Sequence, residues 1–381
     1  MYPLGIDLYL VGLPQIATSL QATEADLHAA FSIYLVGMAS TMIFGGLLAD
    51  KCGRRPVAIL STIILTLASW WAMQATDPLQ FFIARFGQGI GSGFAYVAAF
   101  AILRDVLDDD KRAKVLSMIN GITCIIPVLA PVIGHLILLV SPWPVLFLVM
   151  AITAVMIGLA CLFALKETRS VNHQESGSIP WHKFLSRFFL SRLFILSFSV
   201  AAILTYVNTS PMLMMEIMGF STGQYSMAMA LLAAVSMTTA FITPTLLVIL
   251  GQQRVMVASQ FLFLIAGVQL SFAGIISNPP LFFTGFAFIC SGFSLGFGTA
   301  TSQALKPFDT RAGLASSVLG ISQITLSAFY IWFMGWLGVS ALNMLTILLF
   351  VTCIGNLAAL LFPRSTKAAL ITPEVTSDRA V

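Results

Sequence analysis

Charge is what this chain has least of. Only 9% of its 381 residues are charged, against about 25% in an ordinary soluble domain. A chain with so few charges and with 30 Phe cannot stay solvated, which excludes both a soluble globular domain and a disordered chain. With 58% hydrophobic residues, the composition is that of an integral membrane protein.

Cysteine is also scarce. The five cysteines are spread along the chain without the spacing of a disulfide framework or a zinc site. We therefore expect no metal and no cofactor. No nucleophile and base stand together and no phosphate loop is present, so we do not expect an enzyme. The net charge of +4 does not predict a nucleic acid partner, because the basic residues lie in short loops between apolar segments.

The sequence contains long stretches without any charged residue. A helix that crosses a bilayer needs about 20 mainly apolar residues. Three uncharged stretches are long enough to cross twice, and turn signals such as 141–144 (SPWP) and 278–280 (NPP) divide two of them. The alternating pattern of a membrane barrel is absent. The sequence predicts an all-α protein with twelve transmembrane helices, near 1–20, 27–49, 56–76, 79–103, 114–139, 144–165, 193–215, 224–249, 255–276, 281–304, 313–335 and 340–362.

The basic residues predict the orientation in the membrane. Of the 19 Lys and Arg, all except Arg85 fall on one set of alternate connections and on the C-terminal tail. By the positive-inside rule this side is the cytoplasm, so both termini are expected to be cytoplasmic. Asp7 follows Met1 closely and no basic residue precedes it, so we expect the natural start to lie upstream.

A polar stretch divides the spans into six and six. We predict an N-terminal half at 1–165, a cytoplasmic linker at 166–192, a C-terminal half at 193–363 and a cytoplasmic tail at 364–381. One constant shift superposes 112–113 on 311–312 and 93–94 on 292–293. Two six-helix halves related by a parallel repeat are typical of secondary transporters, in which the substrate cavity lies between the halves. Such a monomer needs no second copy to form its pathway.

Asp7 is the first candidate for proton coupling. A charge at the bilayer centre costs several kcal/mol, so an ionisable residue within a span is a functional candidate. Asp7 lies in the first span, and its carboxyl can be neutral when buried and ionised when wetted. The alternative is an acid that caps the helix or reaches the interface near the helix end.

Arg85 is the second candidate. It stands within the fourth span, and Gln88 lies about one turn further along on a similar face. Arg85 could stabilise the charged form of a nearby acid, bind backbone carbonyls, or serve only as a structural anchor. The glycines that follow predict close approach of neighbouring helices and no phosphate loop, because no strand precedes them; they are Gly89, Gly91 and Gly93.

The loop after the second span, residues 46–55 (GLLADKCGRR), carries the sharpest motif. Its glycines allow a tight turn, and its Asp and Arg are four residues apart and able to pair. An acid at the end of the fourth span lies on the same side. A purely topogenic basic loop would explain neither the acids nor the glycines, so we predict a cytoplasmic gate made of Gly46, Asp50, Gly53, Arg54 and Asp105.

Weaker candidates lie elsewhere in the spans. Pro131 and Gly134 predict a kink and close packing in the fifth span. His135 is a candidate for proton coupling, but a lone membrane histidine is more often hydrogen-bonded to a neighbouring helix. Glu216, near the outer interface, is a weaker candidate for attracting cationic substrates.

Several of these residues resemble motifs of the major facilitator superfamily, specifically of its twelve-span drug:H+ antiporters. Residues 46–55 match the motif after the second helix. Residues 85–91 (RFGQGIG) match the fourth-helix motif, which that family associates with proton coupling, and 130–135 (APVIGH) partly match its fifth-helix antiporter motif. The resemblance covers essentially the whole chain.

The resemblance implies proton-driven export of chloramphenicol-like amphiphilic drugs by alternating access. Polar and aromatic side chains within the spans suit a promiscuous cavity, and the ones we select are Tyr9, Tyr96, Asn120, Asn208 and Gln323. The alternative is an exporter or facilitator of a small metabolite without strict proton coupling. A membrane sensor or scaffold is less consistent with the sequence, because no sizeable soluble output domain is present.

Overall fold

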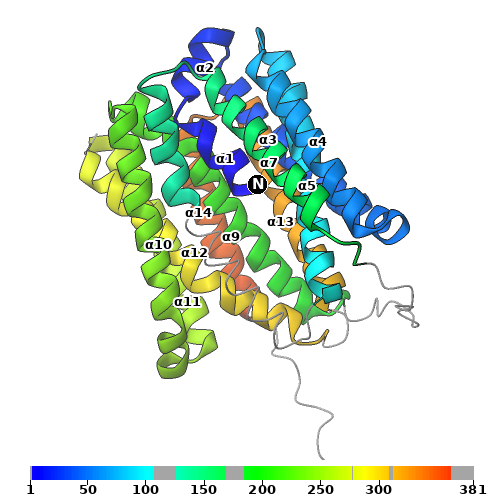
Figure 1. The fold of residues 1–381 in the computed structure, drawn as a ribbon. Coiled ribbons are helices and arrows are strands. Elements are labelled where there is room, and N and C mark those ends of the chain that lie inside the picture. The colour runs from blue at the N-terminus through cyan, green and yellow to red at the C-terminus, as the bar shows by residue number, and fades with distance from the viewer. Residues whose placement is uncertain (1, 107–125, 169–183, 277, 309–311, 362–381) are drawn as a thin grey trace, which may run out of the picture.

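The computed structural model describes residues 2–106, 126–168, 184–276, 278–308 and 312–361, and these residues form helices without any strand (Figure 1). In chain order the helices are α1 (Tyr2–Leu10), α2 (Leu13–Leu20), α3 (Glu24–Cys52), α4 (Arg54–Met73), α5 (Pro78–Val106), the helix Ile126–Leu138, α7 (Pro144–Ala164), α9 (Arg187–Pro211), the π-helix η1 (Met212–Ile217), α10 (Thr222–Leu250), α11 (Gln252–Ile276), α12 (Pro279–Leu305), α13 (Ala312–Trp336) and α14 (Ala341–Leu361).

The helices match the predicted spans. Nine of those in the described ranges are long and apolar enough to cross a membrane, and α3 joins them when its two bent parts are taken as one span. The pair α1–α2 and the shorter apolar helix Ile126–Leu138 occupy the remaining two predicted positions. The predicted all-α membrane fold is therefore confirmed. Most of the predicted linker and the tail lie outside the described residues, and α9 already begins within the range predicted as linker.

The first predicted span is broken. α1 ends at Leu10 and α2 begins at Leu13, with Gly12 as its N-cap residue. Pro14 explains the break, because a proline has no backbone N–H to donate to the carbonyl four residues earlier. The amide of Gly12 donates to the carbonyl of Tyr9 (2.9 Å), which closes the end of α1.

The helices form two halves with matching parts. In the N-terminal half, α5 packs between α3 and α4, and α4 packs on α7. In the C-terminal half, α11 packs on α12 and α14, and α9 packs on α13. α3 and α10 have 29 residues each, and each is followed by one glycine with positive φ and then by the next helix. Those glycines are Gly53 (φ 100°) and Gly251 (φ 78°). The helix pattern therefore repeats between the halves, although these glycines and helix starts are one residue closer than the shift that aligns the sequence motifs.

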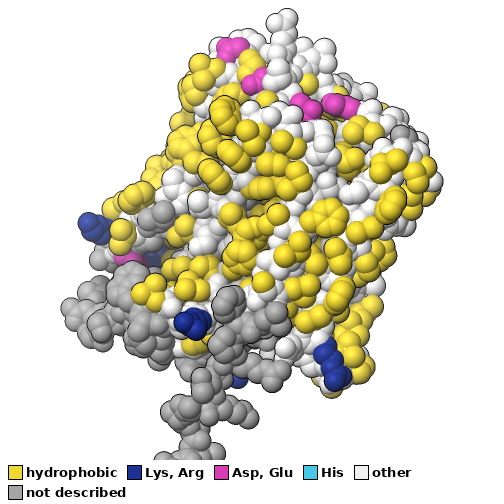
Figure 2. Space-filling view, turned by 180° about the vertical axis from the view of Figure 1, so that it is seen from behind, with side chains coloured by type: hydrophobic (Ala, Val, Ile, Leu, Met, Phe, Trp, Pro, Cys, Tyr) yellow, Lys and Arg dark blue, Asp and Glu magenta, His cyan; other side chains and the backbone are white. Residues whose placement is uncertain are grey.

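The two ends of the bundle differ in charge. At one end, which we call the acidic end, the connections carry Glu24, Asp26, Asp77 and Glu216. At the opposite end, which we call the basic end, they carry Lys51, Arg54, Arg55, Arg254 and Lys306. Figure 2 shows Lys and Arg side chains at its left edge and in its lower half and most acidic side chains near its upper edge, with a broad hydrophobic surface between them. This is the charge pattern of a multi-pass membrane protein.

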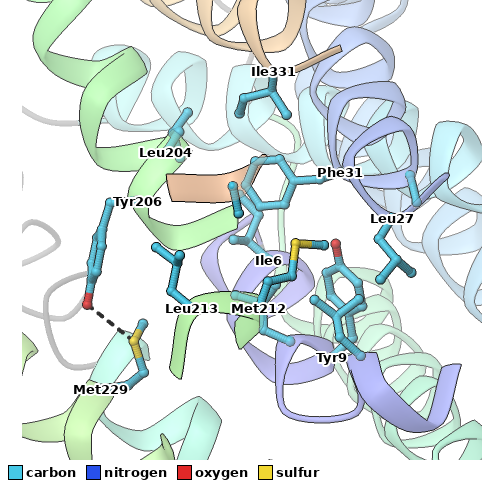
Figure 3. Packing of buried hydrophobic residues seen from close by; sticks show 14 of the residues in the cluster. Ile6, Tyr9, Leu27, Phe31, Leu204, Tyr206, Met212, Leu213, Met229 and Ile331 are labelled. Atoms are coloured by element: carbon cyan, nitrogen blue, oxygen red, sulfur yellow. Dashed lines mark hydrogen bonds between the residues drawn. The ribbon is translucent and has the colours of Figure 1, made fainter. Parts of the chain in front are cut away.

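The core continues from one half into the other. Tyr9 and Phe31 of the N-terminal half belong to the same buried cluster as Tyr206, Leu213 and Ile331 of the C-terminal half (Figure 3). α3 also packs along α13. The contact between halves is therefore a packed apolar surface as well as a set of polar contacts.

Glycines allow α5 to approach its neighbours closely, as predicted. A Cβ atom on Gly89 would overlap the backbone carbonyl of Tyr34 in α3, and one on Gly93 would overlap Thr41. Gly91 faces the other neighbour, since its Cβ would lie 2.6 Å from Leu65 Cγ in α4. Backbone contact on two sides fixes α5, which carries Arg85, between α3 and α4.

Gly89→Ala is therefore expected to force α3 and α5 apart and to destabilise the protein by about 1–3 kcal/mol. Gly298→Ala is the matched control, because a Cβ on this helical glycine would meet nothing within 4 Å. The midpoint of thermal unfolding in detergent measures both variants. Equal midpoints for the two would show that the close approach of α3 and α5 contributes nothing.

Candidate functional site

Arg85 is fully buried in the N-terminal half (0% exposed). Its Nη1 atom donates to the carbonyl oxygen of Gly5 (2.9 Å) and to Gln88 Oε1 (2.8 Å). The guanidinium lies over the ring of Tyr9 (4.2 Å to its centroid) and over that of Tyr34 (4.5 Å). Two aromatic faces and two oxygen acceptors thus surround the cation. The predicted proximity of Arg85 and Gln88 is confirmed.

The polar contacts extend from Arg85 toward α3 and α4. Gln88 Nε2 donates to Ser69 Oγ (2.8 Å), and Tyr34 OH donates to Ser92 Oγ (2.9 Å). A cavity of about 10 Å³ lies between these polar side chains and the apolar side chains of Leu4, Leu65 and Met150, which is room for about one water molecule. Within the described residues, Arg85 Nε and Nη2 make no hydrogen bond, so the site keeps donor capacity that its own side chains do not use.

Asp7 is also buried, with 4% of its surface exposed, and lies in α1, which contacts α5 and α7 of the N-terminal half and α9 of the C-terminal half. Among the described residues its carboxyl makes no ion pair, so Arg85 does not neutralise it in this state. Of the alternatives for Arg85, the structure shows the one in which it binds a backbone carbonyl.

The residues of the predicted cytoplasmic gate come together at the basic end. Arg54 Nε donates to Asp105 Oδ2 (2.6 Å), and Arg54 Nη2 lies 3.0 Å from Asp50 Oδ1. Arg54 Nη1 also donates to the carbonyl of Ala49 (2.8 Å). Gly53, between α3 and α4, takes the left-handed conformation that this turn needs (φ 100°), whereas a Cβ on Gly46 would meet nothing within 4 Å.

Glu167 is a member of this cluster that the sequence reasoning missed. It follows α7, and its Oε1 and Oε2 accept from the backbone amides of Arg54 (2.8 Å) and Arg55 (3.1 Å) at the N-terminus of α4. A carboxylate at a helix N-terminus accepts hydrogen bonds from the free backbone N–H groups and interacts favourably with the positive end of the helix dipole. The sequence signal that could have identified Glu167 is its position, because it is an acidic residue directly after a span and on the same side of the membrane as the loop 46–55. The cluster thereby joins α3, α4, α5 and the end of α7 within the N-terminal half.

The candidates for the substrate cavity do not share one place. Tyr9 is fully buried against Arg85, Phe81 and Phe147. Tyr96 is partly exposed and stacks near Phe100 (4.5 Å between centroids). Gln323 is half-buried in α13, and Asn120 lies outside the described residues. Asn208 is buried in a contact between the halves that we describe next.

Four hydrogen bonds join the halves at the acidic end. Asn208 Nδ2 of α9 lies 2.6 Å from His28 Nδ1 of α3, and the amide of Ala341 in α14 donates to Glu24 Oε1 (3.2 Å). On the other side of the bundle, His135 Nδ1 lies 3.0 Å from Thr222 Oγ1 in α10. There Ser226 Oγ also donates to the carbonyl of Pro131 (2.9 Å). In this state the two halves are therefore joined at the acidic end.

The fifth-span candidates belong to this contact. A Cβ on Gly134 would lie 2.9 Å from the carbonyl oxygen of Leu8, so the helix Ile126–Leu138 packs closely against α1. His135 is hydrogen-bonded to a neighbouring helix, which is the simpler of its two predicted roles. Glu216 is exposed in η1 at the acidic end.

The described residues hold no group of three or more His, Cys, Asp or Glu side chains placed to bind a metal. What they hold is a buried cation and a buried acid in a bundle of membrane-spanning helices with two matching halves. This arrangement defines a membrane transporter with its ionisable groups between and beside the halves.

Comparison with known proteins identifies the family. Residues 1–331 match the Major Facilitator Superfamily, and the chain belongs to it. Three similar relatives are called multidrug resistance protein MdtL. The one from Klebsiella pneumoniae is 54% identical over 95% of this chain and 92% of its own length; those from Vibrio parahaemolyticus and Shewanella oneidensis are each 52% identical with the same coverage.

Two solved structures share the fold. A D-xylose-proton symporter superposes with a TM-score of 0.77 at 15% identity, over 94% of this chain and 93% of its own. A bacterial homolog of the human lysosomal transporter Spinster superposes with a TM-score of 0.71 at 15% identity, over 94% and 92%. At this identity the likeness concerns the fold alone.

The basic-end cluster predicts unequal effects for its two carboxylates. Asp105 is 2% exposed in its side chain, so Asp105→Ala removes the buried carboxylate partner of a buried guanidinium and is expected to cost about 3–5 kcal/mol. Asp50 is 61% exposed, and Asp50→Ala is expected to cost less than about 1 kcal/mol. The thermal unfolding midpoint in detergent ranks the two variants. A larger loss for Asp50→Ala would contradict the burial argument.

Proposed function

We propose that this chain exports small amphiphilic drugs, of the chloramphenicol-like class, in exchange for protons by alternating access of its two halves. The observation that carries the proposal is Asp7, a buried carboxyl between the halves without an ion-pair partner among the described residues. The names of the relatives support a drug as the substrate. No resident cofactor is invoked.

A buried carboxyl suits exchange because it is costly to keep charged in an apolar place. A proton that enters from one side makes Asp7 neutral and allows the halves to close around it. Wetting from the other side allows the carboxyl to ionise, and it can then attract a polar or cationic drug. The proton and the drug thus compete for the carboxyl of Asp7.

Arg85 limits how Asp7 can be stabilised. Its guanidinium is held by Gln88 of its own helix and by the backbone carbonyl of Gly5 in α1, the helix that carries the acid. Because Gly5 and Asp7 both belong to α1, a shift of α1 during rocking changes the distance between the two charges. We propose that Arg85 stabilises the ionised form of Asp7 in the state that releases the proton.

The charge pattern supports the orientation. We propose that the basic end faces the cytoplasm and the acidic end faces outward in a bacterial inner membrane, with both termini cytoplasmic and one chain as the working unit. The cluster of Asp50, Arg54, Asp105 and Glu167 would then hold the cytoplasmic ends of the N-terminal helices together as one rigid body while the halves move.

Purified protein in liposomes tests the function. An imposed pH gradient is expected to drive chloramphenicol against its own concentration gradient, and a protonophore is expected to abolish this accumulation. The second candidate function, a facilitator without proton coupling, would equilibrate the compound with or without the gradient. Equilibration without accumulation would therefore overturn proton exchange and favour the facilitator.

Asp7→Asn is expected to abolish drug accumulation driven by the pH gradient, because the amide does not titrate. Exchange of labelled for unlabelled drug across the same liposome membrane is expected to persist. Asp77→Asn is the matched control, since Asp77 lies at the acidic end and caps Gln80, a role that Asn also fills. Full pH-driven accumulation by the Asp7→Asn protein would show that another group carries the proton.

A further inference from the structure

We propose that His28 and Asn208 form the gate that closes the transport pathway at the acidic end, with Glu24 as its tether to α14. The inference rests on the proposed function, because it assigns residues to one of the two closed states of that transport cycle. His28 would be a positioning residue, which acts by holding α3 against α9 and does not touch the substrate.

His28 lies at a junction of both halves. It is 1% exposed in the second turn of α3, and Asn208 of α9 is 2% exposed. A Cβ added to Gly335 of α13 would lie 3.0 Å from His28 Cβ, so α13 packs directly on this side chain. One residue of the N-terminal half is thus enclosed by two helices of the C-terminal half.

The hydrogen bond between His28 and Asn208 has a defined direction. The amide nitrogen of Asn208 carries only hydrogens to donate, so His28 Nδ1 accepts at 2.6 Å. The ring hydrogen then sits on Nε2, which faces Glu24 Oε1 at 3.6 Å. Both groups of the bond are buried, and a buried polar group without a partner is costly. The bond therefore favours the closed arrangement for as long as no water reaches it.

Glu24 extends the contact to a third element of the C-terminal half. Its side chain is 49% exposed, and its Oε1 accepts the backbone amide of Ala341 in the first turn of α14. Glu216 of η1 lies within electrostatic range of Glu24, which places a second carboxyl near this end of the gate. Separation of α3 from the C-terminal half must break the contacts to Asn208 and Ala341 together. This coupling is what a gate requires.

The gate is tested by distance measurement, without drug and without a gradient. Spin labels at Thr76 and Ser340, both exposed at the acidic end of opposite halves, report opening by pulsed EPR in lipid nanodiscs, in a background without the native cysteines. Labels at Thr76 and Gln21, both in the N-terminal half, form the reference pair. His28→Leu is expected to raise the ratio of open to closed molecules by about tenfold, since Asn208 then loses a buried partner.

Three further variants separate a gate from a general structural role. His28→Asn places an amide where Nδ1 stood and is expected to restore the closed distance, although the ring is lost. Ser32→Ala removes a buried hydroxyl one turn along α3 that bonds only within its own helix, and it is expected to leave the distances unchanged. His28→Leu combined with Asn208→Leu is expected to be no more open than either single change.

An unchanged Thr76–Ser340 distance in both His28→Leu and Asn208→Leu would overturn the gate, as would equal opening by Ser32→Ala. The distances do not depend on transport. If the wild-type protein moves no drug in liposomes but His28→Leu opens the acidic end, the gate stands and the proposed function fails.

Discussion

The burial of one positive charge is the constraint on which the rest of this structure depends. Arg85 lies inside an apolar helix bundle with no carboxylate within ion-pair distance among the described residues. An isolated charge in such surroundings costs several kcal/mol. Two tyrosine rings, a backbone carbonyl of α1 and the side chain of Gln88 offset this cost. Glycines then hold α5 at the depth where these partners can reach it.

The same arrangement separates the two tasks of a transporter. The middle of the bundle keeps Asp7 and Arg85 buried. The two ends carry polar contacts that can break and re-form. At the basic end Arg54 and Glu167 tie helices of one half into a unit, and at the acidic end His28 and His135 bond across to the other half. Rocking of the two halves requires both a rigid half and contacts between the halves that can break.

The sequence predicts the helices well, because a membrane leaves few alternatives to an apolar helix of fixed length. It also predicts Arg54 with its acids, since the turn and the spacing are local. It does not predict the break at Pro14 as the end of a separate helix, nor Glu167, whose partner lies far away in the chain. Asn208 is a predicted cavity residue, and its contact with His28 of the other half is not visible in the sequence. Such pairings depend on how helices from two halves face each other, which hydropathy does not encode.

The central claim is that the proton and the drug compete for one buried acid, Asp7. The most direct measurement is proton release when chloramphenicol is added to the purified protein in weakly buffered detergent solution, followed with a pH indicator. Competition predicts that drug binding releases protons from the wild-type protein, and that the release disappears when Asp7 cannot titrate. Drug binding with no proton release over the whole pH range in which the protein is stable would contradict the claim.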